Sequence, residues 1–173
     1  VSLETFYKAI NKVERSLIRT GADEVTYNLH VMLRFGLETE MLEGKLAVKD
    51  LPEAWNERYR ADVGVLPPGD SLGVLQDMHW YSGAIGGYFQ SYTLGNILSA
   101  QFFDAAVKTF PGIPAEIASG NFTLLHGWLK EHIYRYGRQF PATEIIQRAT
   151  GRPLDIEPYI SYLRTKYGAL YRL

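Results

Sequence analysis

The sequence has no cysteine among its 173 residues. That absence excludes a disulfide scaffold, a cysteine-ligated zinc site, an iron–sulfur cluster and a thiol nucleophile. An excess of charge is also missing, because 18 Lys and Arg residues stand against 19 Asp and Glu residues, so we expect no nucleic-acid partner. No apolar run approaches the ~18–20 residues that a membrane helix needs, and no signal peptide is visible. We therefore expect no membrane partner and a cytoplasmic location.

Apolar residues are plentiful, at 46% of the chain. A chain of this length can bury roughly 70% of the surface that its unfolded form exposes, so one self-sufficient core is expected.

The first residue is Val1 rather than Met, and an amphipathic pattern begins almost at once. This start favours a fragment of a longer polypeptide, with a processed N-terminus as the alternative.

The apolar residues recur at three- and four-residue steps, which is typical of amphipathic helices. No strand alternation, internal repeat or domain boundary is visible, so we predict an all-α fold with a single helical domain of about seven to nine helices. Asp50 is expected to cap the third helix. The stretch 92–110 is apolar almost all round, which predicts a buried central helix. The expected helices span residues 3–18, 23–42, 51–63, 92–110, 121–136, 142–150 and 156–170, with shorter segments near 75–80 and 114–119.

The histidines do not form a metal site by their spacing. Two of the four, His126 and His132, are six residues apart, which on a helix points them about 240° from each other. No His-Glu-x-x-His sequence is present, although zinc hydrolases commonly use it. A lone histidine is more commonly a hydrogen-bonded residue than a ligand. We therefore expect no metal to be bound by this chain alone. The glycine-rich stretch 83–87 also lacks the pattern of a phosphate-binding loop.

A polar set lies on the second expected helix, where Tyr27, His30 and Arg34 follow steps of three and four. These three side chains share one helix face and are expected to line a cleft together. The planar guanidinium of Arg34 suits a bidentate contact with a carboxylate. The alternative is that Arg34 forms a surface ion pair with Glu38, one turn further on. The opposite face, expected to point into the core, carries Val25, Leu29, Met32, Leu33 and Gly36.

A second polar set surrounds His79, which follows Gln76 and Asp77 and precedes two tyrosines, Tyr88 and Tyr92. A histidine and tyrosines beside glycine-rich backbone are the groups that donate hydrogen bonds to a developing oxyanion. The alternative is a packed aromatic corner in which His79 is hydrogen-bonded to backbone. Composition alone leaves both interpretations open.

The segment from Gly73 to Trp80 reads Gly-Val-Leu-Gln-Asp-Met-His-Trp. It resembles the Gly-x-x-Gln-Asp-x-His-Trp motif of the carboxypeptidase Taq family, the thermostable zinc metallocarboxypeptidases. The resemblance extends over essentially all of residues 1–173. The further segments that are similar to the family are 23–35, 49–56, Tyr92–Asn96, Trp128-Leu129 and Tyr136-Gly137.

The resemblance implies an all-α enzyme that removes residues one at a time from the C-termini of peptides. Family members are longer, usually dimeric, and bind zinc through a His-Glu-x-x-His helix and a downstream glutamate. Those ligands lie N-terminal to the segments quoted above. Residues 1–173 are then expected to be the C-terminal helical region, inactive alone. The complete enzyme is expected to be a zinc-dependent homodimer whose substrates are peptides with a free C-terminal carboxylate.

The resemblance also implies roles for single residues. Arg34 matches the arginine that binds the substrate's terminal carboxylate, and Tyr27 and His30 are the other expected substrate-binding residues. His79 matches the motif histidine near the zinc, a donor to the tetrahedral intermediate. The residues expected to support His79 are Gln76 and Asp77, which orient it, and the catalytic tyrosines Tyr88 and Tyr92.

One departure from the family lies between these tyrosines, where Gln90 replaces a common proline. The departure leaves open which tyrosine is catalytic. A different class of function also stays open, namely a stand-alone, zinc-free helical module for peptide binding or dimerisation. The 23 aromatic residues of the chain would suit such an interface.

Overall fold

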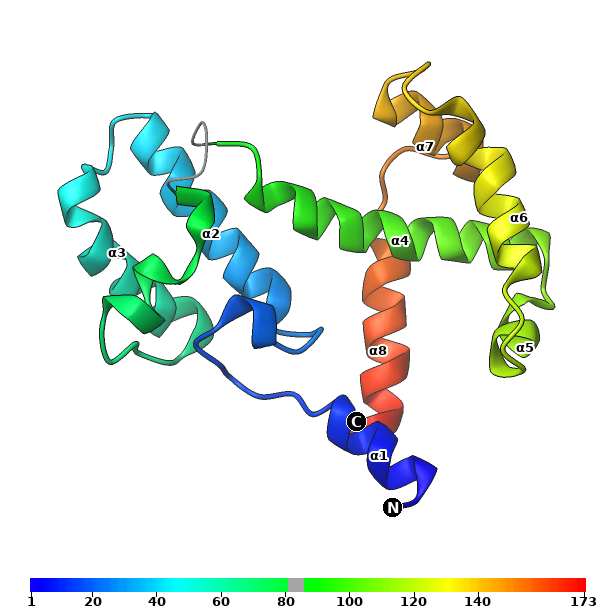
Figure 1. The fold of residues 1–173 in the computed structure, drawn as a ribbon, viewed down its shortest axis with the longest axis horizontal. Helices are drawn as coiled ribbons and strands as arrows, with labels where there is room; N and C mark the ends of the chain where they lie inside the picture. The colour runs from blue at the N-terminus through cyan, green and yellow to red at the C-terminus, as the bar shows by residue number, and fades with distance from the viewer. Residues whose placement is uncertain (81–85) are drawn as a thin grey trace. The chain divides into compact units, whose positions relative to one another are not determined.

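The computed structural model describes residues 1–80 and 86–173 (Figure 1). Within these ranges the chain forms eight α-helices and no strand, which confirms the all-α prediction. No helix in the described part is both long and apolar enough to cross a membrane. The helices are α1 (Leu3–Ile10), α2 (Tyr27–Leu42), α3 (Leu51–Arg58), α4 (Phe89–Thr109), α5 (Ile113–Ala118), α6 (Thr123–His132), α7 (Ala142–Thr150) and α8 (Glu157–Tyr171).

The fold divides into two compact units, Val1–Leu94 and Gly95–Leu173. The boundary falls inside α4, where neither composition nor a Pro/Gly-rich linker marks it in the sequence. The single domain expected from the sequence stays a prediction. Each unit has its own cluster of buried apolar side chains.

Helix α1 is shorter than predicted, because it ends at Ile10 rather than near residue 18. The chain that follows has no regular secondary structure up to residue 18 and makes hydrogen bonds to distant parts of its unit. The carbonyl of Leu17 accepts from the Tyr59 hydroxyl at 2.9 Å and from the Gln76 side chain at 3.0 Å. These tertiary bonds satisfy a carbonyl that would lack an intrahelical partner even in a helix that ended at residue 18. The apolar periodicity of residues 11–18 therefore predicted a helix that the structure does not contain.

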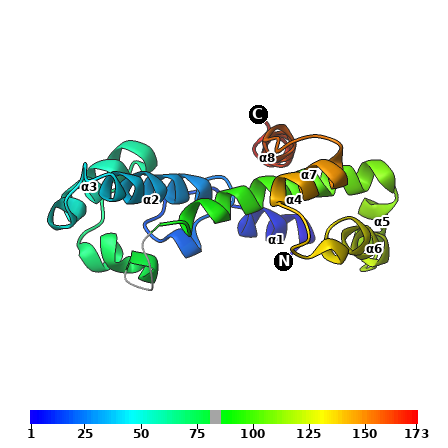
Figure 2. The same cartoon turned by 90° about the horizontal axis from the view of Figure 1, so that it is seen from above.

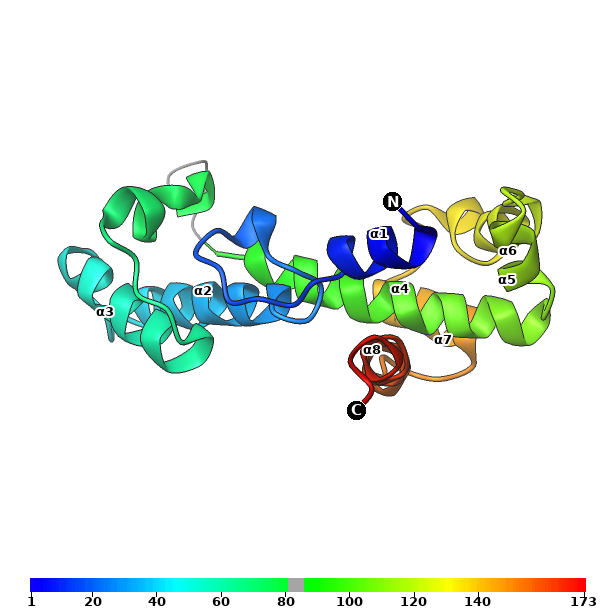
Figure 3. The same cartoon turned by 90° about the horizontal axis from the view of Figure 1, so that it is seen from below.

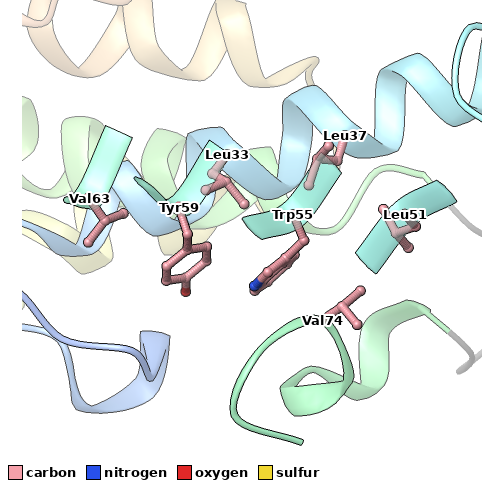
Figure 4. Close-up of a cluster of buried hydrophobic side chains, with 7 residues drawn as sticks. All are labelled: Leu33, Leu37, Leu51, Trp55, Tyr59, Val63 and Val74. Atoms are coloured by element: carbon pink, nitrogen blue, oxygen red, sulfur yellow. The ribbon is translucent and has the colours of Figure 1, made fainter. Parts of the chain in front are cut away.

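The core of the first unit lies between α2 and α3, which pack against each other (Figure 3). In Figure 4, Leu33 and Leu37 of α2 face the rings of Trp55 and Tyr59. Those two rings are stacked, with centroids 4.9 Å apart. Burying each large apolar side chain contributes roughly 1.5–3 kcal/mol, so this cluster is a main source of the unit's stability. The other buried members are Leu51, Val63 and Val74.

The predicted faces of α2 are partly wrong. Leu33 is in the core as expected, but Met32 is 53% exposed. His30 and Arg34, which were expected to line an open cleft, have no exposed surface. They share the buried stripe of Leu37, at helical spacing of three and four residues. A buried carboxylate from another segment makes this burial of a cation tolerable, as described below.

Helix α3 continues as a π-helical turn over Tyr59–Val63, so its predicted end near residue 63 is confirmed in extent. Gly64 ends the turn with a φ of 78°, a left-handed conformation that favours glycine. Asp50 lies at the N-cap position of α3 as predicted, but its side chain makes no capping hydrogen bond. Asp50 itself belongs to a preceding 3₁₀ turn and has helical backbone angles, unlike an ordinary N-cap.

The second unit is built around the part of α4 that follows residue 94, with α5, α6 and α7 gathered beside it (Figure 2). Its most buried apolar residues are Ala106, Ile113 and Trp128. The predicted α4 helix is confirmed, but burial all round is wrong, because Leu94 and Phe103 are about 40% exposed in the described chain.

Three shorter expectations have mixed outcomes. The segment near 75–80 forms two 3₁₀ turns, Val74–Gln76 and Met78–Trp80, rather than an α-helix. Helix α6 stops at His132, and a 3₁₀ turn ending at Gly137 replaces its expected last turn. The predicted helix over 142–150 is confirmed as α7.

Candidate functional site

A buried carboxylate, Asp77, joins segments far apart in the sequence. Its Oδ1 accepts a hydrogen bond from Nη2 of Arg19 at 2.6 Å. Its Oδ2 accepts from Nε of Arg34 at 2.5 Å. Burial alone would raise the pKa of Asp77, but the hydrogen bonds and charges of the two arginines outweigh burial and hold that pKa below its ordinary value. Asp77 is therefore ionised at neutral pH and shared by two cations.

Arg19 is the residue of this site that the sequence analysis missed. Its Nη1 donates to the Tyr27 hydroxyl at 3.0 Å, and its backbone N–H donates to Oε1 of Gln76 at 3.1 Å. Its guanidinium also lies over the Tyr92 ring, 5.0 Å from the centroid. Arg19 thus touches four predicted site residues, Asp77 included. No local pattern pointed to it, because Asp77 is 58 residues away.

Arg34 lies deeper than Arg19. Its Nη1 donates to the backbone carbonyl of His30 at 2.8 Å, and its guanidinium stacks 4.6 Å from the centroid of the Trp55 ring. The alternative prediction, a surface ion pair between Arg34 and Glu38, is wrong. Arg34 pairs with Asp77 instead, and the side chains of Arg34 and Glu38 are both buried. Nη2 of Arg34 is buried and has no hydrogen-bond partner among the described residues. The Nη2 group of Arg34 is therefore a buried donor that is not used within the described part of the chain.

The tautomer of His30 follows from its neighbours. The Tyr59 hydroxyl donates its single hydrogen to the Leu17 carbonyl, so it must accept from Nδ1 of His30, 2.9 Å away. The proton of the neutral ring is thus assigned to Nδ1, which leaves Nε2 as a buried acceptor. Burial, followed by the charges of Arg34 and Arg19, lowers the pKa of His30 to about 4. His30 is therefore neutral at pH 7.

Acid should destabilise the fold through His30. The unfolded ring binds a proton near pH 6.5, whereas the folded ring binds it only near a pKa of about 4. Between these values the unfolded state holds more protons, so stability falls as the pH drops, by up to about 1.4 kcal/mol per pH unit for this group. Urea unfolding at several pH values should show a shallower pH slope for His30→Asn, which can still donate to Tyr59. Equal slopes for the two proteins would contradict this prediction.

The outer part of the site is centred on His79. Its Nε2 lies 3.1 Å from the Tyr92 hydroxyl, and its Nδ1 lies 3.4 Å from Oδ1 of Asp77. The rings of Tyr88 and Phe89 pack against it, with centroids 5.8 and 5.1 Å away. The aromatic packing of the alternative interpretation is present, but the hydrogen bond goes to Tyr92 rather than to backbone. His79 is 20% exposed at its side chain, while Tyr88 and Tyr92 are 48% and 38% exposed, so these three side chains are partly accessible in the described chain.

The remaining predicted residues lie on the inner side of this cluster. Nε2 of Gln76 donates to the carbonyls of Leu17 and Leu72, so its hydrogen bonds hold the extended segment beside Arg19. Tyr27 lies at the start of α2 and reaches the site through Arg19. Positions 83–85 of the glycine-rich stretch 83–87 lie outside the described residues. Its last two glycines, Gly86 and Gly87, have φ angles near 100°.

The described side chains do not fit a metal ion. They contain no group of three or more His, Cys, Asp or Glu side chains placed to bind one. Asp77, the acid beside His79, has both oxygens hydrogen-bonded to arginines. In the second unit, His126 and His132 pack against the rings of Tyr134 and Trp128.

Comparison with known proteins gives consistent matches along the chain. Residues 1–167 match the family model for carboxypeptidase Taq (M32) metallopeptidases. Thermostable carboxypeptidase 1 of Thermus thermophilus is 45% identical over 171 residues, which are 99% of this chain and 33% of that protein. Carboxypeptidase 1 of Bacillus subtilis is 38% identical over 173 residues, or 100% of this chain and 34% of that protein. The chain thus spans about a third of the length of these curated relatives.

Solved structures agree with the sequence matches. The M32 carboxypeptidase of Deinococcus radiodurans R1 superposes with a TM-score of 0.97 at 56% identity, covering 100% of this chain and 35% of that one. Metallocarboxypeptidase 1 of Trypanosoma cruzi superposes with a TM-score of 0.90 at 31% identity, over 96% of this chain and 34% of that one.

Proposed function

Since this chain belongs to the carboxypeptidase Taq (M32) family of metallopeptidases, we propose that it forms the substrate-binding, C-terminal part of a zinc-dependent enzyme that releases C-terminal amino acids from peptides. The chain spans only about a third of its relatives, and its described residues offer no metal-binding group. We therefore assign the zinc to residues outside this chain. The family resemblance also supports a homodimeric complete enzyme.

The observation that carries the proposal is that two buried guanidinium groups share one carboxylate. Arg19 and Arg34 share the single carboxylate of Asp77, so the three groups carry a net charge of +1. His30 does not change this sum at pH 7, because its pKa is about 4. A positive site in a low-dielectric interior attracts an anion. A free carboxylate is what distinguishes a peptide C-terminus from an internal bond, so such a charge suits an exopeptidase.

Arg34 contributes to this attraction through its charge, because it has no exposed surface in this conformation. The groups that can touch a substrate are the exposed ones, His79 with Tyr88 and Tyr92. During attack on a peptide bond, negative charge develops on the carbonyl oxygen. Hydrogen-bond donors already held in place stabilise that charge, and the paired His79 and Tyr92 are suited to this role.

The carboxylate role of Arg34 can be tested in the complete enzyme with Arg34→Met and Arg34→Lys. Arg34→Met should raise KM for a blocked dipeptide with a free C-terminal carboxylate by about tenfold or more, because the net charge of the site falls to zero. Arg34→Lys keeps the charge and should raise KM less.

Metal content and the unfolding midpoint would be measured for each variant. Arg58→Met is the matched control, since Arg58 is another ion-paired arginine of the same unit, with Glu40 as its partner. A fully metallated Arg34→Met enzyme with the KM of the wild type would refute the assignment.

A further inference from the structure

We propose that Arg19 is a positioning residue for catalysis, which orients Tyr92 and Asp77 on the two sides of His79. This inference rests on the proposed function of the His79 site. It assigns to Arg19 a role distinct from that of Arg34, although both arginines pair with the same carboxylate.

The contacts form a closed ring of four side chains. Arg19 grips Asp77 in a fork, with Nη2 at 2.6 Å from Oδ1 and Nε at 3.3 Å from Oδ2. Oδ1 of Asp77 lies 3.4 Å from Nδ1 of His79, and Nε2 of His79 lies 3.1 Å from the Tyr92 hydroxyl. The Tyr92 ring returns to Arg19, whose guanidinium lies over it at 5.0 Å. Both ring nitrogens of His79 therefore face groups that Arg19 holds.

Hydrogen bonds from both the side chain and the backbone hold Arg19 in place. Nε and Nη2 bind Asp77, Nη1 binds the Tyr27 hydroxyl, and the backbone N–H binds Gln76. The residue is only 5% exposed, so water does not compete for these donors. A guanidinium held in this way is a rigid plane against which a tyrosine ring can rest.

The ring contacts separate Arg19 from Arg34. The guanidinium of Arg34 lies against Trp55 and Tyr59, which are core residues with no exposed surface. The guanidinium of Arg19 lies against Tyr27 and Tyr92, and Tyr92 reaches the open end of the site. Arg19 is therefore the cation that links the buried carboxylate to a side chain that a substrate can touch.

A lysine could not replace this arrangement. An ammonium group is a compact point charge, so it can pair with Asp77 but cannot make the forked contact and the planar contact together. Displacement of a catalytic group by about 1 Å can cost on the order of 100-fold in rate. We expect Arg19→Lys to lower kcat by about tenfold or more and to leave KM within about twofold. The Arg34 variants, by contrast, should act mainly on KM.

The experiment is a double-mutant cycle in the complete enzyme, with Arg19→Lys, Tyr92→Phe and the double variant. If Arg19 acts through Tyr92, the double variant should lose little more kcat than Tyr92→Phe alone, because the two changes disable one unit. Arg19→Gln, which keeps an amide donor near Asp77, serves as a second variant should Arg19→Lys not fold. Because it also removes one positive charge and should raise KM, only its kcat is compared in the cycle. Arg58→Lys is the control for loss of an arginine ion pair and should keep the kcat of the wild type.

Each outcome decides between the two claims. A Tyr92→Phe enzyme with full kcat would remove Tyr92 from the proposed catalytic groups and overturn the positioning role of Arg19, while the role of His79 is decided by His79→Gln. A large loss in Tyr92→Phe with unchanged kcat in Arg19→Lys, or fully additive losses, would overturn the positioning role of Arg19 and leave the proposed function standing. Losses in both single variants that do not add would support the inference.

Discussion

Replacing His79 with glutamine should lower kcat of the complete enzyme by about 10²–10³-fold, the loss typical of removing one donor to an oxyanion. His79 is the partly exposed member of the cluster whose Nε2 lies 3.1 Å from the Tyr92 hydroxyl and whose Nδ1 lies 3.4 Å from Oδ1 of Asp77. A donor that binds the transition state more strongly than the substrate affects kcat, so KM should change little. Steady-state kinetics on a blocked dipeptide would measure both constants.

The control for this variant is His132→Gln, which changes a histidine in α6 of the second unit. His132 packs against Trp128, which belongs to the buried apolar cluster of the second unit. Its kcat should match that of the wild type at temperatures well below unfolding. If His79→Gln binds a full complement of metal and its kcat stays within about threefold of the wild type, His79 is not the donor that we propose.

Replacing Asp77 with asparagine should produce the largest loss of stability among single changes to the site. Asp77 is the shared carboxylate of Arg19 and Arg34, and all three side chains are buried. Removing one partner from a buried ion pair costs about 3–5 kcal/mol, because the remaining charge is left without compensation. Here two cations would remain, held close together. Denaturant unfolding should show a loss of at least this size in the free energy of unfolding.

A matched control is Glu144→Gln in α7, where the carboxylate pairs with Arg148 one turn further on. That pair is about half exposed, so its loss should cost no more than about 0.5 kcal/mol. The contrast separates burial from the mere presence of an ion pair. A loss below about 1 kcal/mol for Asp77→Asn would mean that the arginines find other partners or water, and that the buried trio is not a stabilising unit.

The pH dependence of the Asp77 contribution has a definite sign. Because the arginines hold the folded pKa of Asp77 below its unfolded value, the carboxylate stabilises the fold above the unfolded pKa. This contribution disappears as the pH falls through the folded pKa. The wild type and Asp77→Asn should therefore approach each other in stability in strong acid.

The family motif and the helices could be read from the chain alone because both depend on neighbours in sequence. Helix α7 has its predicted limits and α2 has its predicted end, since apolar spacing and a terminal glycine are local signals, although α2 begins at Tyr27 rather than near residue 23. The motif around His79 likewise named residues that the structure brings together, because Asp77, His79 and Tyr92 lie within 16 consecutive residues.

Predictions failed where a side chain or carbonyl found a distant partner. The chain after Ile10 is not helical up to residue 18, and the Leu17 carbonyl in this stretch is bound by Tyr59 and Gln76. Arg34 is buried rather than open because Asp77 neutralises it from 43 residues away. An i, i+4 pattern identifies Glu38 as a nearby partner of Arg34. It cannot identify Asp77, the distant carboxylate with which Arg34 pairs in the structure.

By itself, then, the amino-acid sequence determined the helical class, the approximate limits of most helices and the family to which the chain belongs. Only the tertiary structure decided which face of α2 is buried, which acid the two arginines share, and that Arg19 joins the site at all. The physical reason is that charge burial is settled by where the counter-charge lies in space. Helical periodicity reports only which side chains of one segment share a face.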